Sequence, residues 1–85
     1  MVSNFQVILN PNQAQLIVEN KTENMMEIKI RALNDVYIGG EEIDNTNGFK
    51  IECCDSESIK LGPKASLYGY SLTETRLFVM TSEII

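Results

Sequence analysis

The stretch Met26-Glu27-Ile28-Lys29-Ile30-Arg31-Ala32 decides the fold class, because its apolar and charged residues alternate one by one. A period of two places the apolar side chains on one face of an extended strand and the charged ones on the other, whereas an amphipathic helix repeats every 3.6 residues. The sequence therefore predicts a β-strand over residues 26–32, with one face in a core and the other in solvent.

Short apolar runs of the same kind recur on both sides of this stretch. They are separated by Asn, Gly, Pro and Thr residues, which favour turns. Strands at roughly 8 to 12-residue spacing are typical of sandwiches and barrels. The sequence therefore predicts an all-β fold, a small antiparallel β-sandwich or jelly-roll-like barrel of about seven to eight short strands that forms a single domain over residues 1–85. The further strands are expected at residues 5–9, 14–18, 35–38, 49–53, 58–61, 66–70 and 75–80, and a single helical turn is the only helix expected, within residues 40–46.

The composition argues against several classes of function. The 85-residue chain has no histidine, so the commonest general base and the usual zinc ligand are missing. Seven Lys and Arg against twelve Asp and Glu give a net charge of −5, which argues against the basic surface that binding to a nucleic-acid phosphate backbone requires. No apolar run is long enough to span a membrane, and residues 1–6 lack the pattern of an export signal. We expect a protein that is not an enzyme, has no catalytic residues and no cofactor, and binds neither nucleic acid nor membrane.

Three local features have a structural interpretation. Cys53 and Cys54 are neighbours whose side chains point to opposite faces of an extended segment, so we expect two small buried or half-buried thiols in a protein that folds in a reducing cytosol. The acidic loop 41–48 does not match a calcium-binding EF-hand loop, since Ile43 and Cys54 would stand at ligand positions. We expect a solvated turn there and assign no metal, with a site of another geometry left open. Asn20-Lys21-Thr22 is interpreted as a hairpin turn rather than as a glycosylation site.

The last predicted strand is apolar on both faces, with Leu77 and Val79 on one side and Phe78 and Met80 on the other. A two-layer sandwich has only one interior, so part of this apolar surface is expected to contact another subunit. Such a contact would supply stability that a short chain lacks. The tail at residues 83–85 is expected to be either disordered or docked on a neighbour. The candidate interface residues are Tyr68, Tyr70, Phe78, Met80, Ile84 and Ile85.

Three segments in fixed order resemble small bacteriophage virion structural proteins. These segments are Val36-Tyr37-Ile38-Gly39-Gly40, Asn47-Gly48-Phe49 and Leu61-Gly62-Pro63-Lys64-Ala65-Ser66-Leu67-Tyr68-Gly69-Tyr70-Ser71, and the likeness covers roughly residues 25–82. The chain departs from the common pattern at residues 52–57, where many such proteins have a small, Pro-containing or Gly-containing connection. The resemblance implies a β-sandwich on a phage particle, as a head decoration or cement protein or as a module of a head fibre or tail.

On this basis we expect a non-enzymatic capsid decoration protein, made in the host cytoplasm and located on the virion. Its partners would be the major capsid protein or another virion protein and copies of itself, with a trimer favoured. The alternative is a tail or fibre module that binds a host receptor or carbohydrate, in which Tyr37, Tyr68 and Tyr70 stack on sugar rings.

Overall fold

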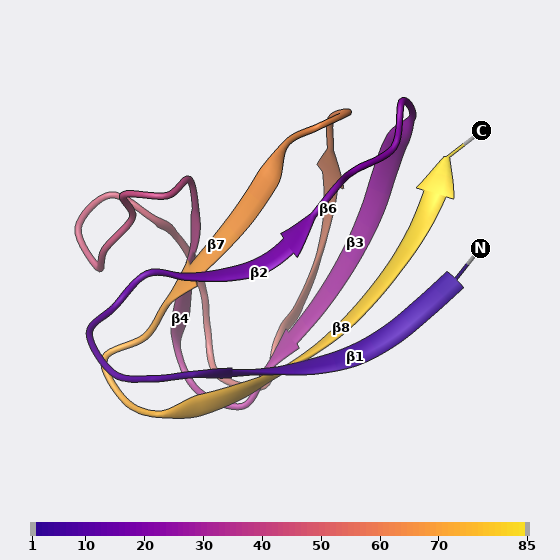
Figure 1. The fold of residues 1–85 in the computed structure, drawn as a ribbon. Coiled ribbons are helices and arrows are strands. Elements are labelled where there is room, and N and C mark those ends of the chain that lie inside the picture. The colour runs from indigo at the N-terminus through magenta and orange to yellow at the C-terminus, as the bar shows by residue number, and fades with distance from the viewer. Residues whose placement is uncertain (1, 85) are drawn as a thin grey trace.

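The computed structural model describes residues 2–84 and shows two four-stranded sheets packed face to face (Figure 1). The eight strands are β1 (Val2–Leu9), β2 (Gln15–Glu19), β3 (Met25–Ala32), β4 (Val36–Gly39), β5 (Phe49–Ile51), β6 (Ser56–Leu61), β7 (Ser66–Tyr70) and β8 (Thr75–Ile84).

The strand order identifies a jelly roll. One sheet has the order β1-β8-β3-β6 and the other β2-β7-β4-β5, and all neighbours are antiparallel. Among these strands only β4 and β5 are both consecutive in the chain and paired, so most of the pairing joins distant segments. This arrangement is that of a double-sheet jelly roll. The predicted all-β fold class is therefore confirmed.

The core lies between the sheets and follows the predicted alternation. In β3 the side chains of Ile28, Ile30 and Ala32 are fully buried, while Lys29 and Arg31 are exposed. Apolar residues from both sheets complete this core, namely Leu9, Ile17, Val36, Ile38, Ile51, Leu61, Leu67, Leu77 and Val79. The strand predicted over residues 26–32 is confirmed and begins one residue earlier.

Several strand ends differ from the prediction because a long partner extends them. β8 continues to Ile84 rather than ending at residue 80, since Met25 and Ile84 pair in the β3–β8 register. β1 begins at Val2 rather than at residue 5, because Val2 pairs with Ser82. The alternative of a disordered tail is therefore wrong for Ile84, whose docking on a neighbouring subunit stays a prediction, and Ile85 lies outside the described residues.

Two predicted connections are also wrong. Residues 40–46 form turns instead of a helical turn, because Asp44 and Asn47 bond to nearby backbone groups. The segment after Asn20 is no hairpin, since β2 and β3 belong to different sheets. Between residues 2 and 84 there is no helix of the length and apolar character needed to cross a membrane.

Candidate interaction surface

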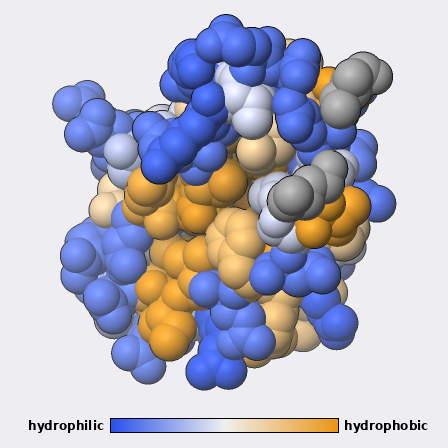
Figure 2. Space-filling model, turned by 45° about the vertical axis from the view of Figure 1, so that its right-hand side comes forward, coloured by the Kyte–Doolittle hydropathy of each residue, from blue (hydrophilic) through white to orange (hydrophobic). Residues whose placement is uncertain are grey.

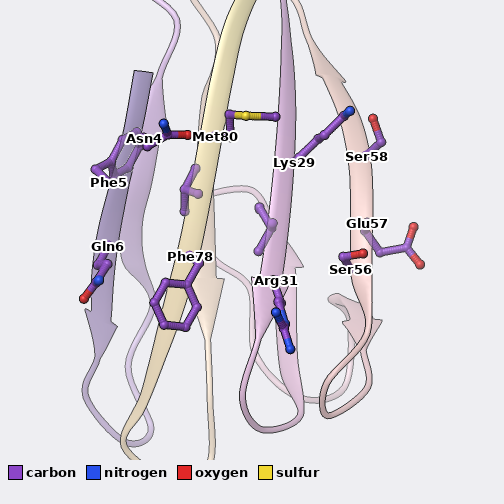
Figure 3. Close-up of a pocket in the computed structure, with 12 residues that line it drawn as sticks. Asn4, Phe5, Gln6, Lys29, Arg31, Ser56, Glu57, Ser58, Phe78 and Met80 are labelled. Carbon is purple, nitrogen blue, oxygen red and sulfur yellow. The ribbon is translucent and has the colours of Figure 1, made fainter. Parts of the chain in front are cut away.

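The outer face of the β1-β8-β3-β6 sheet carries an open groove of about 590 Å³. Phe78 and Met80 of β8 occupy its middle, beside Arg31 and Lys29 of β3 (Figure 3). The β8 residues also face β1, where Gln6 pairs with Phe78. Side chains from all four strands therefore form one continuous surface, with apolar groups at the centre and polar groups around them.

The predicted division of β8 between two faces is confirmed. Leu77 is 0% exposed and Val79 is 3% exposed in the core, whereas Phe78 is 37% exposed and Met80 half-buried on the other side of the strand. Ile84 lies on the same outer face near the end of β8 and is 40% exposed. The assignment of these residues to an interface stays a prediction.

Tyr68 and Tyr70 do not join this surface. Both lie on β7 in the opposite sheet, where Leu67 and Gly69 are buried and the tyrosines are half-buried on the outer side. Tyr70 pairs with Tyr37 of β4. The structure therefore separates the predicted interface residues into two groups on opposite sides of the sandwich, and it gathers the three tyrosines on one face.

Four cations surround the groove or lie near it on the same face, and sequence reasoning did not select them as site residues. We call them the basic face: Lys29 and Arg31 of β3, Lys60 of β6 and Arg76 of β8. The alternation in β3 already placed Lys29 and Arg31 in solvent. Their grouping with Lys60 and Arg76 depends on which strands are neighbours, which no local pattern specifies.

The space-filling view shows how incompletely the sandwich covers its apolar residues. On the side where the termini lie, apolar side chains gather in one area bordered by hydrophilic ones (Figure 2).

β1 is an edge strand of the β1-β8-β3-β6 sheet and contains no charged residue, proline or glycine over Val2–Leu9. Edge strands that lack such residues are ready to pair with another chain.

The thiols of Cys53 and Cys54 do not point to opposite faces, because β5 ends at Ile51 and the two cysteines form a turn. Cys54 adopts a left-handed backbone with φ of 70°, and the two Sγ atoms lie 2.9 Å apart. Both side chains are exposed, so the expectation of buried or half-buried thiols is wrong. The hydrogen bond with Cys54, together with desolvation, raises the pKa of Cys53 above its usual value.

The acidic loop between β4 and β5 uses its carboxylate for its own turns. Asp44 accepts hydrogen bonds from the backbone N–H groups of Thr46 and Asn47 at 2.8 and 3.2 Å, and also one from the Thr46 hydroxyl. These bonds, led by that of the hydroxyl, lower the pKa of Asp44. Within residues 2–84, no three His, Cys, Asp or Glu side chains are grouped as a metal site would require.

Comparison with known proteins bears on the fold alone. No family model matches the chain, and no curated protein matches it. A solved structure from the disulfide-linked pili of Bacillus endospore appendages has a similar fold, with a TM-score of 0.58 and 16% sequence identity. The match covers 94% of this chain and 84% of that chain. At such low identity the similarity supports the small β-sandwich and carries no further conclusion.

Proposed function

We propose that this protein is a non-enzymatic structural subunit that associates with copies of itself and docks on a larger particle. The observation that carries the proposal is the outer face of the β1-β8-β3-β6 sheet, where Phe78 and Met80 line a groove on the side opposite the core. Aromatic residues and methionine are enriched in the centres of protein interfaces. A polar rim around an apolar centre is the usual organisation of such a surface.

Two further observations support association. The chain has 85 residues, and a domain of this size gains much from a partner that covers apolar surface. The uncharged edge strand β1 offers a second means of contact, because its outer edge is free of neighbouring strands in the sheet.

The proposed particle is a bacteriophage virion, with capsid decoration as the role. This location rests on the sequence resemblance over residues 25–82, and a closed trimer is the proposed assembly. A decoration protein stabilises the assembled shell because it binds the assembled state in preference to free subunits. Many copies on a symmetric shell then act together.

The test combines light scattering of the purified chain with co-sedimentation on empty capsids of the phage that encodes it. We expect an oligomer that pellets with the capsids and raises their dissociation temperature. A monomer that stays in the supernatant at every capsid concentration would contradict the proposal.

The gathering of Tyr37, Tyr68 and Tyr70 on the outer face of the other sheet favours a second candidate, a tail or fibre module that binds carbohydrate. Aromatic rings can stack on sugars, and nearby polar groups such as Asn12, which lies 3.4 Å from the Tyr70 hydroxyl, can bond to sugar hydroxyls. Pull-down with host cell-wall polysaccharide separates the two candidates. Binding that is lost in Tyr68→Ala and retained in Phe78→Ser would favour the module.

A further inference from the structure

The seven cations of this protein fall into two groups. Three of them, Lys21, Lys50 and Lys64, lie within 4 Å of a carboxylate, at distances of 3.9, 3.6 and 3.0 Å respectively. The four cations of the basic face form no salt bridge within residues 2–84. In the described part of the chain, the cations without a carboxylate partner are therefore the four that share one face.

This separation makes the molecule electrically polar. Two carboxylates accompany the four cations: the strand alternation places Glu27 on the basic face, and Glu57 of β6 lines the groove itself. Of the seven cations, three lie elsewhere, and of the twelve carboxylates, ten lie elsewhere. A face with an excess of two positive charges thus belongs to a chain with a net charge of −5. Surfaces of opposite sign steer two proteins together and fix their orientation.

A projecting part of the same chain has the complementary character. We call it the acidic knob: Glu41, Glu42 and Asp44 in the loop after β4, with Phe49 at the start of β5. Glu41 and Glu42 are exposed, and Phe49 is 62% exposed. Figure 1 shows this loop extending from the end of β4, away from the strands of the other sheet. The Phe49 ring lines an open apolar pocket with Ile38 and Ile59 and remains largely exposed. The loop thus offers carboxylates that complement the cations of the basic face, and Phe49 offers an apolar group for its groove.

The acidic knob is held in shape before any contact forms. Ile43 is buried and anchors the loop, and the backbone N–H of Gly48 donates a hydrogen bond of 3.2 Å to the Asp44 carbonyl. The Asn47 side-chain oxygen accepts a hydrogen bond of 2.9 Å from the Asp44 N–H. A loop fixed in this way loses little conformational entropy on binding.

We propose that the acidic knob of one copy docks in the groove of the basic face of a second copy. Phe49 would pack against Phe78 and Met80, while the carboxylates of the knob would face Lys29 and Arg31. The inference rests on the proposed function, since it names the partner of the same groove. Because the knob and the groove are different surfaces, the contact is head-to-tail and produces a closed ring or a filament.

The experiment reverses charges on each side and then on both sides of the contact. The variants are K29E/R31E on the basic face, E41K/E42K on the acidic knob, and the fourfold combination. K21E/K64E is the matched control, because it also reverses two cations but lies away from the groove. Self-association of the full chain is measured by analytical ultracentrifugation at low and high salt, and folding of each variant is checked by circular dichroism.

We expect each double variant to raise the dissociation constant by about tenfold or more, since like charges then face each other. The dissociation constant of the fourfold variant should return to within about threefold of the wild-type value, and that of the control should equal the wild-type value. High salt should weaken the wild-type contact. Phe49→Ser should weaken it without a loss of folding, because Phe49 is largely exposed.

Failure of this inference is distinguishable from failure of the proposed function. The head-to-tail contact is overturned if both double variants associate as strongly as the wild type. It is also overturned if the fourfold variant does not regain association. Either result leaves the proposed structural role intact. A wild-type chain that is monomeric and still pellets with capsids would also overturn the head-to-tail contact and leave the structural role. A monomer that binds no particle overturns the proposed function itself.

Discussion

The side-chain amide of Asn20 donates a hydrogen bond of 3.1 Å to the carbonyl oxygen of Leu61. Asn20 directly follows β2 of one sheet, and Leu61 is the last residue of β6 in the other sheet. The same amide also donates to the carbonyl oxygens of Asn24 and Gly62, at 2.8 and 3.0 Å. Asn20 is 0% exposed and joins the crossing between the sheets to the turn after β6. A glycan on this nitrogen would replace one of its two N–H hydrogens and so disrupt this network of bonds.

Asn20→Ala should therefore lower the free energy of unfolding by about 2 to 3 kcal/mol, because it leaves carbonyl groups near the core without a donor. Urea denaturation of the purified chain measures the change. Asn45→Ala, in the exposed loop after β4, is the matched control and should shift stability by less than about 0.5 kcal/mol. Equal effects of the two substitutions would contradict the role of Asn20.

Neighbouring positions on β8 should respond in opposite ways to the same substitution. Leu77→Asp buries a charge in the core and should prevent folding, whereas Phe78→Asp should keep the fold and abolish self-association. Circular dichroism reports folding and light scattering reports association. Loss of the fold in Phe78→Asp would place that ring in the structural core instead.

An added side chain at Gly69 would force neighbouring core side chains to shift. A Cβ at this position would stand 2.7 Å from Cδ1 of Ile17 and 3.3 Å from Cδ1 of Leu9. Gly69→Ala should therefore cost about 1 to 3 kcal/mol of stability through overpacking. At Gly40 an added Cβ meets no atom within 4 Å, so Gly40→Ala should leave the stability nearly unchanged. Thermal unfolding of both variants and the wild type measures the two effects.

The raised pKa of Cys53 depends first on its hydrogen bond with Cys54. Replacement of Cys54 by glycine, which suits the left-handed backbone, should lower the pKa of Cys53 and speed its alkylation by iodoacetamide at pH 8. Because the folded pKa lies above the unfolded value, the associated stability is present at lower pH and is lost as pH rises through the folded pKa. Unchanged alkylation kinetics would show that the two thiols do not interact.

Asp44 has the opposite sign of pH dependence. Its folded pKa is lowered by the hydrogen bonds of Thr46 and Asn47, so the stability it contributes is present above the unfolded pKa and is lost as pH falls through the folded value. Asp44→Asn should be less stable than the wild type at pH 7, and the difference should shrink towards pH 2. Thermal unfolding at both pH values measures it. A difference that is independent of pH would assign the effect to the loop geometry alone.

Much of the fold could be predicted because strand alternation is a local property. The spacing in β3 correctly placed Ile28 and Ile30 inside and Lys29 outside, and the double-sided pattern of β8 correctly separated Leu77 from Phe78. Strand ends were less predictable, since the pairing of Met25 with Ile84 extends β8 beyond its last clearly apolar run. The candidate surface was predicted in part: Phe78 and Met80 share it, and the tyrosines do not.

The sequence by itself determined the strands, the faces of most of them and the absence of histidine chemistry, because a period of two and a composition are properties of the chain alone. Only the tertiary structure decided that Arg31 lies beside Phe78, that Tyr68 lies on the opposite side, and that the thiols of Cys53 and Cys54 meet in a turn. Strand order depends on pairing between distant segments, and the local alternation of residues is compatible with many such orders.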